Sequence, residues 1–376
     1  MSINLRKGVR DLLYSFAAIM LALVVAGVLL LLSGYNVWDA YYNLFYGAFG
    51  DIYNFGLTLV NMIVLIFAGL AVAIGFRGGL FNIGVEGQLY MGGLCAVLVT
   101  LHWGFLPGVL ILPAAFVVAM LAGGAWAFIP GVLKAKTGAH EVVVTIMMNY
   151  IGILLTSFLV RYFFKVPGPV DQTARVPEHL RMAELIPTTR LTGVIFIALL
   201  MVFLFAVLLR HTRLGYEIET VGQSPGAAEY AGISVGRTIV LTMVISGAMG
   251  GLAGASITVG VLQRFITNFS PGYGFAGIAV AVLGRNRPAG IVPAALLFGA
   301  LEAGGVSMQL FTRIPMDLMV VMQGLVILFV AAPELISGIG RTTGRIGRIG
   351  TTRTTRATGT TRTTGTTGRV KTGGRK

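Results

Sequence analysis

The sequence predicts an all-α protein that crosses a membrane about ten times, and three observations lead to this fold class. First, 56% of the 376 residues are hydrophobic and only 11% are charged, with a mean hydropathy of +0.84. A soluble domain carries roughly 25% charged residues. Second, apolar runs of about 20 residues recur along the chain, as a hydrocarbon core about 30 Å thick requires. Third, a glycine-rich, polar stretch separates two of these runs, which is typical of membrane helices that break along a translocation path.

The first span is expected to be an uncleaved helix with its N-terminus in the cytoplasm. Arg6, Lys7 and Arg10 precede its apolar run, and no clear A-x-A cleavage site follows. Eight to ten crossings are compatible with the pattern, and the third and eighth spans are too short to cross as straight helices. We expect these two to be half-helices or to continue through their glycine-rich flanks. The ten expected spans are residues 12–33, 56–75, 88–101, 108–133, 142–163, 191–209, 238–262, 274–284, 290–311 and 317–332.

The distribution of Lys and Arg predicts the orientation of these spans. With the N-terminus inside, eleven Lys and Arg fall on the cytoplasmic side before residue 341 and seven fall outside, five of them in one loop at 161–190. This bias favours both termini in the cytoplasm. The expected organisation is a cytoplasmic N-terminus at 1–11, a membrane domain at 12–335 with an outer loop at 164–190 and a cytoplasmic loop at 216–236, and a tail at 336–376.

The end of the chain is a low-complexity Thr, Gly and Arg segment. Residues 341–376 hold ten Lys or Arg and no acidic residue, so the net charge falls from +14 to +4 when they are set aside. Such a segment buries too little apolar surface to fold alone. We expect a disordered tail that meets anionic membrane lipids. Specific nucleic-acid binding is disfavoured because no aromatic residue interleaves the charges.

The stretch most informative about function is IGFRGGLFNIGVEGQLYMGG at 74–93. It places Asn82, Glu86 and Gln88 among seven glycines between two apolar runs. Glycines permit close approach of the backbone, and broken backbone at membrane depth is tolerated where protein buries it or where it lines a cavity. Small residues that pack helices tightly are the alternative explanation. Ionisable groups inside a membrane are costly, so a role in a path or gate is favoured.

A second stretch is HEVVVTIMMNYIG at 140–152, which starts a span on the cytoplasmic side. Glu141 lies near the helix N-terminus, where its charge is favourable, and Asn149 lies two turns deeper. An amide inside a span needs a partner. Either a neighbouring helix or a transported solute would satisfy it, and the sequence leaves both open.

A third stretch is the cytoplasmic loop GYEIETVGQSPGAAEYAGISVGR at 215–237. Ser224 before Pro225 predicts a helix start, and Gly232 predicts its end. A short helix parallel to the membrane suits docking onto a cytoplasmic protein. The alternative is a plain connector.

Several chemistries are excluded by residues that are missing. No lysine follows a glycine, so the phosphate-binding loop GxxxxGK[ST] is absent, and any ATP must bind another subunit. The chain has a single cysteine, Cys95, four scattered histidines and no HExxH motif, so neither a disulfide nor a metal site is expected. No clustered catalytic set appears either. We expect no catalytic residues and no cofactor in this chain.

Together, GFRGGLFNIGVEGQLYMGG, HEVVVTIMMNY and GQSPGAAEYAGI resemble the membrane-spanning permease of bacterial ABC importers for branched-chain amino acids, ribose and nucleosides. The likeness covers about residues 10–335 and is greatest to the simple-sugar and nucleoside branch. It implies a multi-pass subunit of a prokaryotic plasma membrane. Its partners would be a second permease chain in a homo- or heterodimer, a cytoplasmic P-loop ATPase that holds ATP and Mg, and an extracytoplasmic substrate-binding protein or lipoprotein.

The resemblance also implies roles for particular residues. The stretch from Asn82 to Gln88 would lie beside the translocation path, with Asn82, Glu86 and Gln88 as its candidate residues. Asn149 is a further candidate for the path, from its position inside a span rather than from the resemblance. The helix that couples to the ATPase would include Gln223, Pro225, Ala227, Ala228, Glu229 and Gly232. A nucleoside is the first expectation for the substrate and a simple sugar the second. An ion-coupled secondary transporter, with Glu302 or Asp317 as its acidic residue, is the main alternative of another class.

Overall fold

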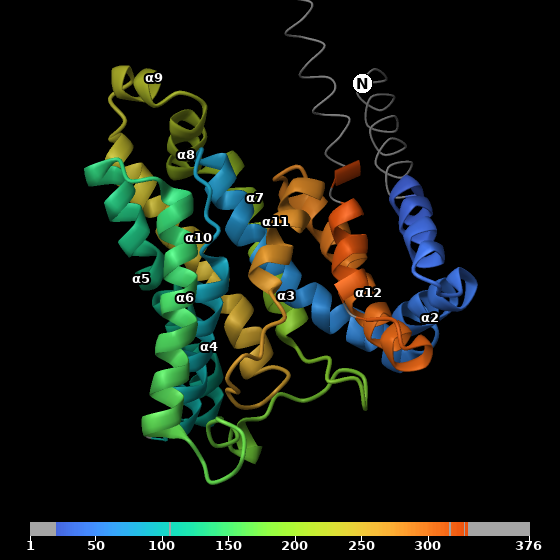
Figure 1. Ribbon diagram of the computed structural model, residues 1–376. Helices are drawn as coiled ribbons and strands as arrows, with labels where there is room; N and C mark the ends of the chain where they lie inside the picture. Colours follow the sequence, from blue (N-terminus) through green and yellow to red (C-terminus); the bar gives the residue numbers. More distant parts are fainter. Residues whose placement is uncertain (1–19, 105–106, 316, 327, 330–376) are drawn as a thin grey trace, which may run out of the picture. The chain divides into compact units, whose positions relative to one another are not determined.

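The computed structural model describes residues 20–104, 107–315, 317–326, 328 and 329. Apart from two isolated β-bridges, every regular element in these residues is a helix (Figure 1). The all-α prediction is therefore confirmed for this part of the chain. The predicted N-terminal segment at 1–11 and the predicted disordered tail at 336–376 lie outside the described residues.

Six helices in the described part are long and apolar enough to cross a membrane. At about 1.5 Å per residue they extend roughly 27–45 Å, against a hydrocarbon thickness of about 30 Å. They coincide with six of the ten predicted spans, which are confirmed as helices of spanning length. These helices are α3 (Ile52–Arg77), α5 (Gly108–Thr137), α6 (Glu141–Leu159) with its π-helical extension η1 (Val160–Phe164), α7 (Val194–His211), α10 (Val235–Thr258) and α12 (Pro288–Thr312).

The other predicted spans correspond to shorter or more polar helices, so ten crossings are not confirmed. The third span lies in α4 (Val85–His102), and the eighth matches α11 (Tyr273–Leu283), whose eleven residues extend only about 16 Å. The first and last predicted spans are described only in part, as helices Met20–Leu32 and Asp317–Val326. The predicted location of both termini in the cytoplasm is not confirmed.

Helix α3 lies at the centre of the described part and is buried along most of its length. On one side it packs against α10, which in turn packs against α4 and α5. On the other side it packs against α11 and α12, and α12 packs against α2 (Val37–Phe49). Figure 1 shows these two groups of helices on either side of α3. Helix α3 therefore connects the two groups.

The outer faces of the long helices carry apolar side chains that remain exposed. Leu154 on α6, Phe196 and Phe203 on α7, and Leu310 on α12 are each more than 60% exposed. Exposed apolar surface on this scale is unfavourable in water and is normal for helices that face lipid.

Glycines allow α10 to approach α4 and α5 at backbone contact distance. A Cβ atom added at Gly254 would lie 1.9 Å from the carbonyl oxygen of Leu89 on α4. One added at Gly251 would lie 2.0 Å from the carbonyl oxygen of Ala119 on α5. Small residues at such contacts are the main means by which membrane helices pack closely.

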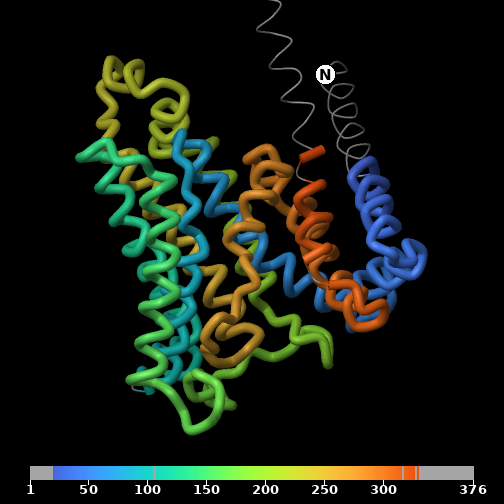
Figure 2. The backbone as a smooth tube through the Cα atoms, in the orientation of Figure 1, coloured from blue at the N-terminus to red at the C-terminus, as the bar shows by residue number. Residues whose placement is uncertain are grey.

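The connections at the two ends of the helices differ. Helices α8 (Arg213–Gln223) and α9 (Pro225–Tyr230) lie at one end, and the long connection 165–193, with its short helix η2 (Glu178–Leu180), lies at the other (Figures 1 and 2). Asp171 holds this connection through Lys165 and Arg161, at 2.5 and 2.8 Å. These two cations lower the pKa of Asp171 below its usual value.

The glycine contact of α10 yields the first prediction. Gly254→Ala places a methyl group against a backbone oxygen that cannot move freely, and overpacking of this kind costs about 1–3 kcal/mol. We expect the purified variant to unfold several degrees below the wild type in a thermal scan.

The matched control is Gly236→Ala in the same helix, where the nearest atom to an added Cβ is at 3.8 Å. This variant should unfold at or above the wild-type temperature, because alanine favours helix more than glycine does. Equal midpoints for the two variants would contradict the packing account.

Candidate functional site

The predicted interruption at 74–93 is a short break between two helices. Helix α3 ends at Arg77, Gly79 adopts a φ of +71°, and α4 begins at Val85. The residues between them are not helical. The break is therefore shorter than the glycine-rich stretch 74–93, because the residues up to Arg77 and from Val85 onward are helical.

Asn82 is the central side chain of the break. Its amide and that of Gln88 donate to each other's oxygen, both at 3.1 Å. Asn82 also accepts from the backbone N–H of Gly84 at 3.0 Å and donates to Ser246 of α10 at 2.8 Å. The Ser246 hydroxyl donates onward to the carbonyl of Ala71 in α3 at 2.5 Å. Three helices and the break are therefore joined through one amide.

Asn149 holds the same break from α6. Its side-chain oxygen accepts from the N–H of Gly87 at 2.8 Å, and its NH₂ donates to the carbonyl of Ile83 at 2.8 Å. The sequence left open whether this amide bonds to a neighbouring helix or to a solute. In this structure its partners are backbone groups at and just after the break.

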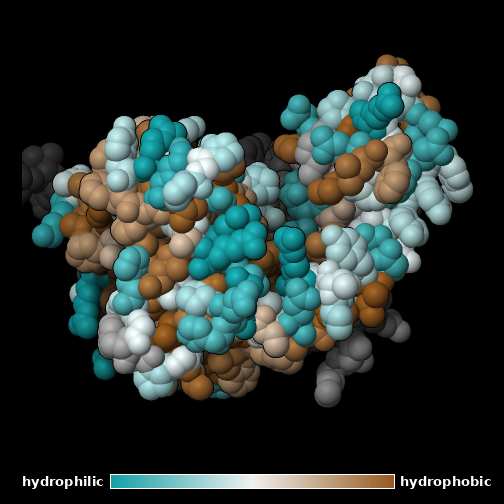
Figure 3. Space-filling view, turned by 90° about the horizontal axis from the view of Figure 1, so that it is seen from below, coloured by the Kyte–Doolittle hydropathy of each residue, from teal (hydrophilic) through white to brown (hydrophobic). Residues whose placement is uncertain are grey.

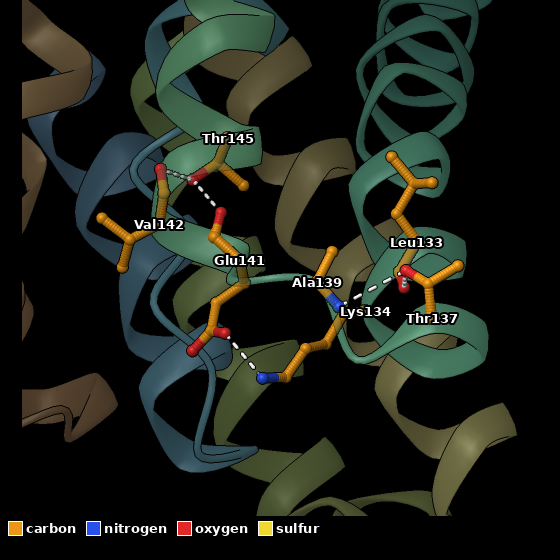
Figure 4. A network of polar contacts seen from close by, with 7 residues as sticks. All are labelled: Leu133, Lys134, Thr137, Ala139, Glu141, Val142 and Thr145. Atoms are coloured by element: carbon orange, nitrogen blue, oxygen red, sulfur yellow. Dashed lines mark hydrogen bonds and ion pairs between the residues drawn. The ribbon is translucent and has the colours of Figure 1, made fainter.

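The corner between α5 and α6 positions Asn149. Lys134 at the end of α5 forms an ion pair with Glu141, the first residue of α6, at 2.8 Å (Figure 4). The Thr137 hydroxyl accepts from the N–H of Ala139 at 3.4 Å, and the Thr145 hydroxyl donates to the carbonyl of Glu141 at 2.8 Å. These bonds fix the start of α6, from which Asn149 lies two turns away.

Glu86 lies where two helices begin. It is in the first turn of α4, and its carboxylate accepts from the N–H of Gly274 in the first turn of α11 at 2.7 Å. The Ser270 hydroxyl accepts from the N–H groups of Gly272 and Tyr273 at the same start of α11, both at 3.2 Å. Two helix N-termini thus face one carboxylate, and both favour negative charge there. This arrangement explains how a carboxylate is accommodated among apolar helices.

The structure brings all four predicted path residues into one buried region. Asn82, Glu86, Gln88 and Asn149 are each only 1–3% exposed, and each makes hydrogen bonds within the chain. These bonds fix the break between α3 and α4 and the start of α11 beside it. A role in lining the translocation path stays a prediction.

The predicted short helix is confirmed as α9, with the start and end that the sequence indicated. The Ser224 hydroxyl caps it by accepting from the N–H of Ala227 at 3.3 Å, and Gly232 follows it with a φ of +76°. Of the six residues predicted to couple to an ATPase, Ala228 is 0% exposed. Ala228 therefore packs inward, and the other five are exposed: Gln223, Pro225, Ala227, Glu229 and Gly232.

Two features at this end were missed in the sequence. Tyr230, the last residue of α9, is 98% exposed. Because Ala228 faces the protein, Tyr230 lies on the opposite, solvent-facing side of the helix. Arg77, at the end of α3, pairs with Glu219 of α8 at 2.7 Å and donates to the carbonyl of Asn286, between α11 and α12, at 3.0 Å. The sequence gives one hint of this role: Arg77 is a single charged residue directly before the glycines of the break.

Within the described ranges, no group of three or more His, Cys, Asp or Glu side chains is placed to hold a metal ion.

The network around Asn82 yields the second prediction. Asn82→Leu leaves the N–H of Gly84 and the amide of Gln88 without their partner, and each unsatisfied buried group costs about 1–3 kcal/mol. We expect thermal unfolding of the purified variant well below the wild type. Asn43→Leu is the control, since the Asn43 amide donates to the Asp39 carbonyl within α2. A wild-type midpoint for Asn82→Leu would show that the network does not hold the break.

The sequence is similar to known permease proteins along most of its length. Residues 53–331 match the family described as branched-chain amino acid transport system / permease component. The guanosine ABC transporter permease protein NupP of Bacillus subtilis is 39% identical over 332 residues, which are 87% of this chain and 94% of that protein. The nucleoside ABC transporter permease protein NupB of Lactococcus lactis is 35% identical, over 87% of this chain and 93% of its own length.

A glucose ABC transporter permease protein, TsgB13 of Haloferax volcanii, is 34% identical over 84% of this chain and 86% of its own length. Bacillus subtilis and Lactococcus lactis each have a second, more distant relative, the permease proteins NupQ and NupC. No solved structure matches the chain significantly. The family match spans most of the chain, including the break, α9 and α11, and the chain therefore belongs to the branched-chain amino acid transport system permease component family.

Proposed function

We propose that this chain is the permease subunit of an ATP-driven importer and forms the translocation path for nucleosides. The observation that carries the proposal is the similarity, across nearly the whole chain, to permeases named for guanosine and for nucleosides. A simple sugar is the second candidate, which the similarity to a glucose permease favours.

A permease of this family with six apolar helices of spanning length is a multi-pass protein of the plasma membrane. We propose the partners that an importer needs: a second permease chain, a cytoplasmic ATPase that holds ATP and Mg, and an extracytoplasmic binding protein or lipoprotein. The paired permease proteins of the two nucleoside systems support a heterodimer. In this proposal the present chain holds no cofactor and does no bond chemistry.

An ion-coupled transporter is less well supported. It would need a carboxylate that is free to exchange ions along the path. Glu302 accepts a hydrogen bond from Gln323 at 3.1 Å, and Glu86 is bonded at the start of α11. Asp317 lies at the start of the helix Asp317–Val326.

The docking site for the ATPase is proposed to be the exposed face of α9. The helix is anchored through Ala228, which leaves Tyr230 projecting beyond it. Tyrosine is enriched among the residues that dominate protein interfaces, because a rigid ring buries a large area and its hydroxyl still bonds. A projecting tyrosine on a short, capped helix suits a groove on a partner protein.

Motion of α9 would reach the break through α8. Gly222, near the end of α8, packs so closely on α3 that an added Cβ would lie 2.1 Å from the carbonyl oxygen of Arg77. Arg77 bonds to Glu219 of α8 and to the carbonyl of Asn286. One side chain thus links the helix before the docking site, the end of α3 and the turn that starts α12.

We propose that ATP-driven movement of α9 moves α8, and that the bonds of Arg77 to Glu219 and Asn286 transmit this movement so that α3 shifts relative to α11. The path would open beside the two helix N-termini that meet at Glu86. Asn82, Gln88 and Asn149 would keep the break closed to lipid while the helices around it move. A ligand shifts such an equilibrium only by its differential affinity for the two states.

The exposed tyrosine yields the third prediction. Tyr230→Ala should lower the amount of ATPase that co-purifies with the chain by about tenfold or more, since loss of an interface hot spot costs about 2 kcal/mol or more. Tyr53→Ala is the control: this tyrosine is 48% exposed and lies at the opposite end of α3. Undiminished recovery of the ATPase with Tyr230→Ala would place the docking site elsewhere.

The link through Arg77 yields the fourth prediction. Glu219→Gln should raise the ATP hydrolysed per molecule imported by about fivefold, which corresponds to about 1 kcal/mol of lost coupling. Thermal stability should change little, because both side chains of the pair are about one-third exposed and such pairs contribute at most about 1 kcal/mol.

The matched control is Glu217→Gln on the same helix, which breaks the exposed pair with Arg213 at 3.7 Å. Its ratio of hydrolysis to import should stay at the wild-type value. If both variants behave alike, the link through Arg77 does not couple the two events.

The subunit assignment is tested by purifying the tagged chain from its native membranes in mild detergent and identifying the bound proteins by mass spectrometry. Recovery of a P-loop ATPase and a second permease is the expected result. Recovery of the chain alone, after crosslinking excludes dissociation, would favour an ion-coupled transporter.

A further inference from the structure

A polar cavity lies at the end of the helices opposite α9, apart from the break. It encloses about 220 Å³ between the connection 165–193 and the segment that follows α10. Figure 3 views this end of the described part, where hydrophilic residues gather in the middle of the face. The charged residues that line the cavity are Arg175, Arg190, Arg264 and Glu184.

The charges of this lining do not balance. Three guanidinium groups face one carboxylate, and that carboxylate already accepts from the N–H of Thr188 at 2.9 Å. Among the ion pairs within 4.0 Å in the described ranges, none involves Arg175, Arg190 or Arg264. The Nε atom of Arg264 is buried and has no hydrogen-bond partner. A buried guanidinium donor without an acceptor is costly, so the cavity favours a ligand that supplies one.

Backbone hydrogen bonds join the two segments that carry Arg175 and Arg264. The N–H of Val176 donates to the carbonyl of Gln263 at 2.8 Å, and the N–H of Thr173 donates to the carbonyl of Phe265 at 2.9 Å. These bonds tie the residues beside Arg175 to those beside Arg264. Such preorganisation lowers the ordering cost of binding.

We propose that this cavity is an oxyanion-binding site that takes a phosphate or carboxylate group. The planar guanidinium matches the geometry of these groups and binds them through paired hydrogen bonds. A neutral nucleoside would leave the positive charges uncompensated, so the site is distinct from the translocation path. The oxyanion comes either from a free solute or from an acidic side chain of a docked extracytoplasmic protein.

The first test needs no transport. The full chain, purified in detergent, is unfolded thermally in inorganic phosphate and in chloride of equal ionic strength. Phosphate at about 20 mM should raise the midpoint of the wild type by roughly 2 °C through binding to the folded state. The gain should be lost in Arg264→Gln and in Arg190→Gln, so the test does not depend on one variant folding.

Arg181→Gln is the matched control. Arg181 belongs to the same connection, pairs with Glu178 at 3.1 Å and does not line the cavity. This variant should keep the phosphate gain. The proposal is overturned if phosphate gives the wild type no gain over chloride, or if both cavity variants keep the gain.

A second measurement separates the two sources of the oxyanion, and this arm rests on the proposed function. In an uptake assay with the binding protein present, phosphate at constant ionic strength should inhibit the wild type if an acidic side chain docks in the cavity. Arg190→Gln should lose this sensitivity. Uptake that phosphate does not inhibit, together with the thermal gain, assigns the site to a free oxyanion. Failure of uptake altogether would count against the proposed function and would leave the thermal test intact.

Discussion

The structure depends on one constraint: backbone groups of a broken helix inside a membrane have no water to bond with. The break between α3 and α4 meets this constraint with side-chain amides. Asn82 and Asn149 together bond to backbone groups of Ile83, Gly84 and Gly87. Gln88 and Ser246 hold Asn82 in turn. Removal of any one of these side chains leaves buried polar groups without a hydrogen-bond partner. Four polar side chains, from the break, α4, α6 and α10, therefore meet at this point.

The same break accounts for the arrangement of the helices around it. Because α4 begins directly after the break, its N-terminus can meet that of α11, and the two favour the carboxylate of Glu86. Helix α11 has only eleven residues, and α3 packs between the two groups of helices and connects them. At the C-terminal end of α3, where the break begins, Arg77 bonds to Glu219 of α8 and to the carbonyl of Asn286 in the turn before α12. Arg77 thereby links the break to α8, the helix that precedes the proposed docking helix α9.

The sequence predicted the long apolar helices well, since their length and composition alone determine whether they can span. It also predicted the break and the cap of α9, because glycine, serine and proline act locally. It missed α8, because residues 215–223 were assigned to the cytoplasmic loop; in the structure they are helical, and Ile218 and Val221 are buried. The bond between Asn82 and Ser246 joins residues 164 positions apart, and no local pattern indicates such a pairing. The outward face of Tyr230 and the unpaired arginines of the cavity likewise depend on tertiary packing.

The central claim is that this chain passes a nucleoside through the membrane with energy from ATP bound elsewhere. The most direct measurement is uptake of labelled guanosine into proteoliposomes that contain the chain with its co-purified partners. The account predicts uptake that requires ATP on the side of the ATPase, persists when ion gradients are collapsed, and is competed by unlabelled nucleosides and not by glucose. Uptake that proceeds without ATP and is driven by an ion gradient would contradict it.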